Sequence, residues 1–148
     1  MPLTRRLQQV IEDLAAVDDP QERLALVIDR AKRIPPLAPA ERVDVNRVAG
    51  CVSVVWIIPV MRGGVCEFRS DAESPVVRGL LALLCDYYSG VPPGTIVASE
   101  TDPLEQTGLA RNLSPTRRNG LASARTAIRA FATRNLSAPP ATAARPVS

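Results

Sequence analysis

Residues 48–56 read Val-Ala-Gly-Cys-Val-Ser-Val-Val-Trp, and they open a long run of β-branched side chains. A run so rich in Val and Ile predicts a strand from Val48 to Val60. Alternation then gives the strand two faces, one with Val52, Val54, Trp56, Ile58 and Val60 and the other with Ser53, Val55 and Ile57. Because both faces are apolar, we expect at least part of the strand to be covered on both sides.

Cys51 stands at the mouth of this strand, directly after Gly50. A glycine permits a tight loop with no side chain crowding the approach to the thiol. We therefore interpret Cys51 as the residue that carries the chemistry. On general burial tendencies alone, a cysteine at a strand end is more often a small buried hydrophobe, and at this point that alternative stays open.

Downstream of the strand, Arg62-Gly63-Gly64-Val65 is a hairpin signal, because two glycines can adopt positive φ. The partner strand is expected over Val65 to Arg69, with Cys66 and Phe68 on one face. Upstream, apolar residues recur at helical spacing in two segments, first at Leu7, Val10, Ile11, Leu14 and Val17 and then at Leu24, Val27, Ile28, Ala31 and Ile34. Asp19-Pro20 can cap and open the second helix, and Pro35-Pro36 ends it, so residues 35–46 are expected to form a surface loop leading to Cys51.

Four further proline signals predict helices in the second half of the chain. Ser74-Pro75 opens the most apolar helix, which Gly90 ends, and the prolines at 92–93 and 103 begin two short helical pieces. Ser114-Pro115 opens the last helix, with an apolar face of Leu121, Ala124, Ile128 and Phe131 and with Arg118, Arg125 and Arg129 expected to face water. Helices, an antiparallel meander and more helices predict an α+β fold, a small sheet of two or three strands covered by helices. We expect one domain over residues 1–136 and a disordered tail over 137–148.

Composition excludes several kinds of chemistry. The chain has no histidine, so the Ser-His-Asp triad, the Cys-His pair and His-ligated zinc are ruled out together. Three widely spaced cysteines argue against a disulfide framework. The net charge of +3 and the scarcity of aromatic residues argue against nucleic-acid binding. No signal peptide and no apolar run of about 18 residues is present, so we expect a soluble, cytoplasmic protein.

Three sequence blocks resemble those of the SufE-type cysteine desulfuration proteins, the SufE/CsdE family. They are Asn46-Arg47-Val48-Ala49-Gly50-Cys51 with Ser53, Val55 and Trp56, then Val77-Arg78-Gly79-Leu80-Leu81, and finally residues 114–121, which read SPTRRNGL. The blocks stand in the family's order, and the resemblance extends from about Leu7 to about Ala132. It implies a SufE/IscU-like fold.

The resemblance also implies a function. Cys51 would accept sulfur from the persulfide of a SufS-type cysteine desulfurase, stimulate that enzyme and pass the sulfur to an iron–sulfur scaffold complex. Such an acceptor needs no cofactor of its own, because the pyridoxal phosphate belongs to the desulfurase. By the same resemblance, Glu73, Glu105 and Arg117 match positions that support the acceptor loop or dock the partner.

Two departures from the family pattern keep alternatives open. Val52 and Val54 replace two glutamines beside the cysteine, and Asp71-Ala72-Glu73-Ser74 stands where the family reads Asp-Ser-Asp-Ala. One alternative is a non-catalytic binding protein that docks another partner through the more apolar loop. Another is an iron–sulfur scaffold that uses Cys51, Cys66 and Cys85, although a fourth ligand is missing. The sequence also leaves a homodimer open.

Overall fold

The computed structural model describes residues 5–49, 54–111 and 113–136. Its elements follow the order that the sequence predicts. They are α1 (Arg5–Ala15), α2 (Pro20–Ala31), the 3-10 turns η1 (Pro39–Glu41) and η2 (Asp44–Asn46), β1 (Val55–Arg62), β2 (Val65–Ala72), α3 (Pro75–Tyr88), α4 (Pro93–Ala98), α5 (Pro103–Gln106) and α6 (Pro115–Leu136). The α+β class is therefore confirmed.

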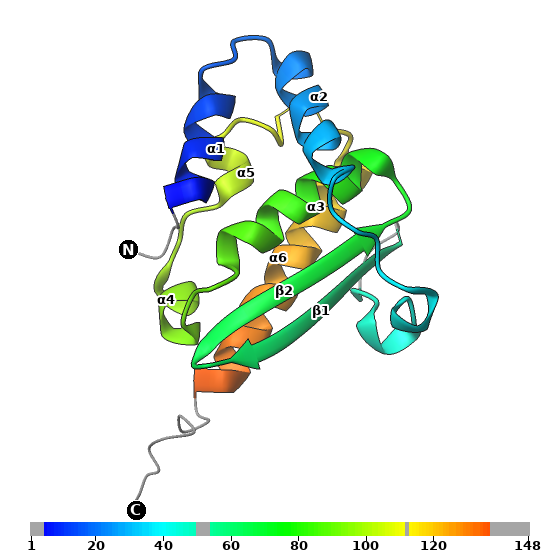
Figure 1. Ribbon diagram of the computed structural model, residues 1–148, viewed down its shortest axis with the longest axis vertical. Helices are drawn as coiled ribbons and strands as arrows, with labels where there is room; N and C mark the ends of the chain where they lie inside the picture. Colours follow the sequence, from blue (N-terminus) through cyan, green and yellow to red (C-terminus); the bar gives the residue numbers. More distant parts are fainter. Residues whose placement is uncertain (1–4, 50–53, 112, 137–148) are drawn as a thin grey trace, which may run out of the picture.

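The sheet of the described residues is a two-stranded antiparallel hairpin. Its register runs from Val55 opposite Ala72 to Arg62 opposite Val65. Gly63 and Gly64 form the turn with φ of 61° and 86°, as the sequence predicts for a hairpin that follows the strand twist. Figure 1 shows α3 and α6 lying against the same side of this hairpin.

The first strand begins later than predicted, at Val55 rather than Val48. Val48 donates its backbone N–H to the carbonyl of Val55 at 2.9 Å, and Arg47 forms an isolated bridge with Trp56. Residues 47 and 48 therefore fold back along the start of β1 instead of leading straight into it. Residues 50–53, which include Cys51 and Val52, lie outside the described residues, as does the tail 137–148.

The two faces of β1 are unequally covered. Val55 and Ile57 are 0% and 6% exposed and face the core, whereas Trp56 and Ile58 are half-buried. The second strand extends to Ala72, three residues beyond its predicted end, because its pairing with β1 continues to that point.

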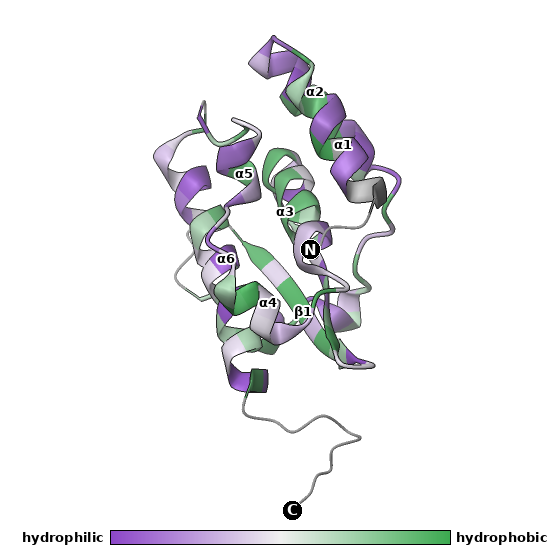
Figure 2. Ribbon diagram, turned by 90° about the vertical axis from the view of Figure 1, so that its left-hand side faces the viewer, coloured by the Kyte–Doolittle hydropathy of each residue, from purple (hydrophilic) through white to green (hydrophobic). Residues whose placement is uncertain are grey.

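Helix α3 is central, as its apolar sequence predicts. Ser74 caps it by accepting the N–H of Val77 at 3.3 Å, and Gly90, with φ of 79°, follows its C-terminal end. The buried residues of α3 include Val77, Leu80, Leu81, Leu83 and Leu84. In Figure 2 the apolar colour is concentrated on α3 and β1, whereas α1 and α2 show largely hydrophilic residues on the outside.

Helices α2 and α3 approach closely at Gly79. A Cβ at this position would lie 3.1 Å from Cα of Ile28 and 3.2 Å from the carbonyl oxygen of Val27. Both contacts are with backbone atoms, which cannot rotate away as a side chain would. The glycine therefore sets the distance between the two helices.

Helix α6 buries Leu121, Ala124 and Ile128 as predicted, and Phe131 is half-buried. The prediction that Arg125 and Arg129 face water is wrong. Both are half-buried. Arg125 donates to the carbonyl of Thr101, and Arg129 donates to three carbonyls, those of Ile96, Val97 and Ser99. These carbonyls lie at the end of α4 and in the chain after it, where the backbone offers few donors, so the arginines of the neighbouring helix supply further ones; the Ile96 carbonyl also accepts the N–H of Ser99 at 3.2 Å.

Within the described residues, no helix combines the length and the apolar character needed to cross a membrane.

Replacing Gly79 with Ala tests the helix contact. We expect Gly79→Ala to lower the free energy of unfolding by about 1–3 kcal/mol, because the added methyl group must push α2 away from α3. Urea denaturation measures the change. Gly120→Ala in α6 is the matched control, since a Cβ there meets nothing within 4 Å, and it should leave stability unchanged or raise it. Equal stability of Gly79→Ala and the wild type would contradict the tight contact.

Candidate functional site

Two of the three cysteines are core residues. Cys66 on β2 is 0% exposed and Cys85 on α3 is 2% exposed, and both are free thiols. Burial raises the pKa of the Cys66 thiol, and it raises the pKa of Cys85 to about 12 despite a hydrogen bond with Ser70. A thiol reacts as its thiolate, so neither side chain is suited to nucleophilic chemistry at neutral pH.

Cys51, the predicted reactive thiol, lies outside the described residues, but both flanks of its segment are described. The Val48–Val55 hydrogen bond joins the two flanks at the start of β1. On the far flank, the carbonyl of Val54 accepts the N–H of Glu73 at 3.2 Å. The points at which the chain enters and leaves residues 50–53 are therefore fixed to each other and to the junction of β2 and α3.

A buried carboxylate holds the loop that leads to this segment. Asp71 is 1% exposed. Its Oδ2 accepts the backbone N–H of Leu37 at 3.1 Å and Nη2 of Arg42 at 2.6 Å. Its Oδ1 accepts the N–H of Ala72 at 2.8 Å and Nε of Arg78 at 3.0 Å. A buried charge needs this degree of pairing to avoid a large desolvation cost.

Opposing influences act on the pKa of Asp71. Desolvation by burial is the largest and raises it. The hydrogen bonds from Arg42, Ala72 and Leu37, together with the charge of Arg42, outweigh that effect, so the pKa of Asp71 lies below its ordinary value. The group is therefore ionised at neutral pH.

Arg42 and Arg78 connect Asp71 to two other parts of the fold. The guanidinium of Arg42 lies over the ring of Trp56, 5.6 Å from its centroid, and so ties the loop 35–46 to β1. Arg78 donates to the carbonyls of Ala31 at 3.2 Å and Ile34 at 2.9 Å, and so closes the C-terminal end of α2. One cluster thus joins α2, the loop, the hairpin and α3.

Sequence reasoning missed the role of this cluster. Asp71 and Arg78 lie in segments that the family comparison of the sequence covers, but the sequence pattern predicts no function for either residue. The available signal was an acidic residue near the end of a strand, followed within the next helical turns by an arginine. Arg42 gave no signal, because it lies 29 residues before Asp71 in a loop without periodicity.

The three predicted docking residues lie on different parts of the chain, Glu73 after β2, Glu105 on α5 and Arg117 on α6. Glu73 is exposed at the end of β2, and its backbone contacts Val54 beside the Cys51 segment. Arg117 is exposed in the first turn of α6, where its N–H donates to Oγ of Ser114 at 3.3 Å. Glu105 is exposed on α5. Among the described residues, no hydrogen bond or ion pair joins any two of the three.

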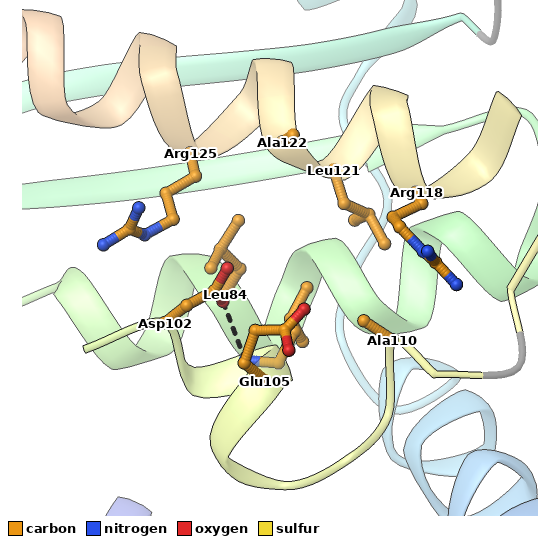
Figure 3. A pocket seen from close by; sticks show the side chains of 9 residues that line it. Leu84, Asp102, Glu105, Ala110, Arg118, Leu121, Ala122 and Arg125 are labelled. Atoms are coloured by element: carbon orange, nitrogen blue, oxygen red, sulfur yellow. Dashed lines mark hydrogen bonds between the residues drawn. The ribbon is translucent and has the colours of Figure 1, made fainter. Parts of the chain in front are cut away.

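Two surface clefts lie among the described residues near these positions. One, of about 190 Å³, is bordered by Val45–Ala49, Ile57 and Pro59 of β1, Phe68 of β2, and Ala127, Ala130 and Arg134 of α6. The chain before Cys51 therefore forms one wall of a groove against α6. The other cleft, of about 210 Å³, includes Glu105 and lies between α5 and α6 (Figure 3).

No group of three or more potential metal ligands occurs in the part of the chain that the structure describes. Cys66 and Cys85 are enclosed by the core, so neither is presented at a surface where a cluster could be assembled and released.

These features define a small α+β domain in which two thiols are buried in the core and the described flanks of the segment with the third thiol are hydrogen-bonded at the start of a hairpin. Comparison with known proteins gives the family. Residues 8–132 match the family model described as SufE, the Fe–S metabolism associated domain. The chain belongs to the SufE family.

Two relatives illustrate the relationship. An uncharacterized SufE-like protein of Rhizobium etli is 37% identical over 122 residues, which cover 79% of this chain and 82% of the relative. An uncharacterized SufE-like protein of Synechocystis is 32% identical over 118 residues, covering 80% of this chain and 74% of the relative. The resemblance inferred from the sequence blocks is therefore confirmed.

A solved structure shares the fold. The solution structure of a hypothetical protein from Thermus thermophilus matches 92% of this chain and 99% of its own length with a TM-score of 0.72. At 21% sequence identity this match supports the fold alone.

Asp71→Asn tests the buried network. The amide keeps the shape but loses the charge that pairs with Arg42 and Arg78, so we expect a loss of about 3 kcal/mol in the free energy of unfolding at pH 7. Since the folded pKa is lowered, the carboxylate's contribution is present above the ordinary value of 3.8 and is lost as the pH falls through the folded value. Denaturant titrations should show the wild type and the variant converging below that pH.

Glu67→Gln on the exposed side of the hairpin is the matched control, because its ion pair with Arg62 is solvent-exposed. It should change stability little at any pH. If the difference between Asp71→Asn and the wild type stayed constant into strong acid, the carboxylate would not be the source of the stability.

Proposed function

We propose that this protein accepts sulfur on Cys51 from the persulfide of a SufS-type cysteine desulfurase and passes it on for iron–sulfur cluster assembly. The observation that carries the proposal is the burial of the other two thiols. Cys66 and Cys85 are enclosed in the core with raised pKa values, so the thiol within the family motif is the one left for chemistry.

The transfer step is thiolate attack on a sulfur–sulfur bond. The Cys51 thiolate attacks the terminal sulfur of the partner's cysteine persulfide, a new S–S bond forms on Cys51, and the bond in the partner breaks. The partner's cysteine leaves as a thiolate. The transferred terminal sulfur keeps its proton. No net oxidation or reduction occurs and no further reactant is needed.

Such chemistry fits a protein without histidine. Persulfide exchange needs an accessible thiolate more than a resident general base. In this proposal the pyridoxal phosphate belongs to the desulfurase, and the protein acts as acceptor and activator rather than as an independent enzyme. Passing the sulfur to a scaffold is the same kind of exchange, in which a thiolate of the scaffold attacks the persulfide on Cys51.

The clamped flanks support a presentation role. The hydrogen bond from Val48 to Val55 and that from Glu73 to Val54 hold both ends of the Cys51 segment, and the Arg42–Trp56 contact holds the loop before it. Fixing the flanks before docking reduces the conformational entropy that these flanking residues lose when a partner binds.

Glu73, Glu105 and Arg117 are proposed to support the loop or dock the partner, as the family resemblance implies. All three are exposed. The backbone of Glu73 donates to the carbonyl of Val54, which flanks the Cys51 segment, and this contact supports a role for Glu73 beside the acceptor loop.

A desulfurase assay with purified proteins tests the proposal. With a SufS-type desulfurase and cysteine, the wild type should gain one sulfur atom on the Cys51 peptide, seen by mass spectrometry, and should stimulate the desulfurase. Cys51→Ser should abolish both effects. Cys85→Ser is the control, because a buried thiol that only packs can be replaced without loss of stimulation as long as the protein folds.

Three results would favour other functions. A folded Cys85→Ser variant without stimulation would overturn the assignment of Cys51. Retention of partner binding and cellular function in Cys51→Ala would indicate a non-catalytic binding protein. Visible absorption after anaerobic reconstitution with iron and sulfide would indicate a scaffold.

A further inference from the structure

The cleft between α5 and α6 carries separated charges over an apolar floor. Its floor is formed by Leu84, Leu104 and Leu121, all of them buried, and Ala110 and Ala122 complete the apolar lining. At about 210 Å³ it is smaller than the roughly 300–1,000 Å³ of sites for drug-sized ligands, so only a small molecule fits it.

The two walls of the cleft have opposite charge. Figure 3 shows Arg118 and Arg125 extending from α6, while Asp102 and Glu105 come from the facing wall, with the carboxylate of Glu105 directed towards α6. Among the ion pairs of the described residues, none joins the two walls. The charges are therefore held apart across the cleft instead of neutralising each other.

Each arginine is held by backbone carbonyls or a hydroxyl group, and not by the carboxylates of the facing wall. Arg118 donates through Nη2 to the carbonyls of Arg111 and Leu113. Arg125 donates through Nε to the hydroxyl of Tyr88 at 3.0 Å and through Nη2 to the carbonyl of Thr101. A guanidinium has five N–H donors, so these contacts orient each group and leave some of its donors without a partner among the described residues.

The carboxylates of Asp102 and Glu105 accept few hydrogen bonds from the described residues. Asp102 uses Oδ1 to cap α5 by accepting the N–H of Leu104 at 3.0 Å. The carboxylate of Glu105 accepts no hydrogen bond from any residue that the structure describes. An acidic side chain and a guanidinium group thus face one small apolar space.

We propose that this cleft binds a small free α-amino acid as its zwitterion. The ligand's carboxylate would pair with Arg118, its ammonium group with Glu105, and its short side chain would lie on Leu84 and Leu121. An amino acid is the smallest common metabolite that offers both charges and an apolar group on one carbon atom.

Simpler ligands fit less well. Arg118 and Arg125 are seven residues apart on α6, which is about 10 Å along a helix, and in Figure 3 their guanidinium groups extend towards opposite ends of the cleft, so a small anion would meet one of them rather than both. The nearby carboxylates of Asp102 and Glu105 would also repel it. A lone cation would meet the two guanidinium groups, which repel it in turn.

The site itself does not depend on the proposed function, and only the choice of probes rests on it. L-cysteine and L-alanine are the amino acids that a cysteine desulfurase consumes and releases, and both have short side chains. Occupancy of the cleft would then let the acceptor respond to the desulfurase's substrate or product.

Titration of the full chain with L-alanine and with reduced L-cysteine, followed by two-dimensional ¹⁵N–¹H NMR, tests the site without a desulfurase. Saturable shifts are expected at the amides of Leu104, Ala110, Leu121 and Ala122. Arg118→Met and Glu105→Gln should each weaken binding about tenfold or more, since each removes one charge-assisted contact. Propionate and ethylamine, which carry one charge each, should bind more weakly by a similar factor.

Matched variants keep the test specific. Arg117→Met and Glu100→Gln remove the same charges from neighbouring positions that do not line the cleft, and they should bind as the wild type does. The spectra themselves report whether each variant is folded. The proposal fails if no saturable shift occurs, if propionate or ethylamine binds as tightly as alanine, or if all four variants bind alike. Failure of sulfur transfer would leave these results untouched.

Discussion

The structure depends on one buried carboxylate. Asp71 accepts hydrogen bonds from the loop that precedes the Cys51 segment, from its own strand and from α3. Through Arg78 the same cluster reaches the last carbonyls of α2. Because an unpaired charge in this position would be prohibitively costly, all of these parts must be in place together. The cluster therefore couples the formation of the helical hairpin to that of the sheet.

This coupling has a consequence for the proposed acceptor segment. The loop 35–46 buries little of its apolar surface, since Leu37 reaches the core at 4% exposure whereas Val43 and Val45 are 40% and 87% exposed. The hydrogen bond between Arg42 and Asp71 holds the loop in place of apolar burial. Arg42 also contacts the ring of Trp56, the residue next to Val55, and so joins the loop to β1. The segment with Cys51 is thus framed by polar contacts on its upstream side and by the strand on its downstream side.

Local rules predicted most elements of the fold. The proline and serine signals placed the starts of α2, α3 and α6, and the paired glycines placed the hairpin turn, because each of these depends on residues close in sequence. The start of β1 was mispredicted, because Val48 has the same β propensity as Val55 and only its backward pairing distinguishes them. The Asp71 cluster was missed because it also depends on contacts that local sequence does not encode. Its partners come from positions 37, 42 and 78, and no periodicity connects them. Burial identified the roles of Cys66 and Cys85, whereas the placement of Cys51 stays a prediction.

The arginines show how a basic composition can serve the interior rather than a charged ligand. Lys32 is the only lysine among 18 basic residues. Arg78 and Arg129 each donate to two or more backbone carbonyls, and Arg23 does so across the turn after α1, reaching both Val17 and Thr107. A planar guanidinium can satisfy several carbonyls at once, which the compact ammonium group of lysine does less well. Much of the positive charge is therefore committed to closing helix ends and loops. This explains why a net charge of +3 need not mark a nucleic-acid surface, and it directs attention to the places, such as the α5–α6 cleft, where guanidinium donors have no partner within the described part of the chain.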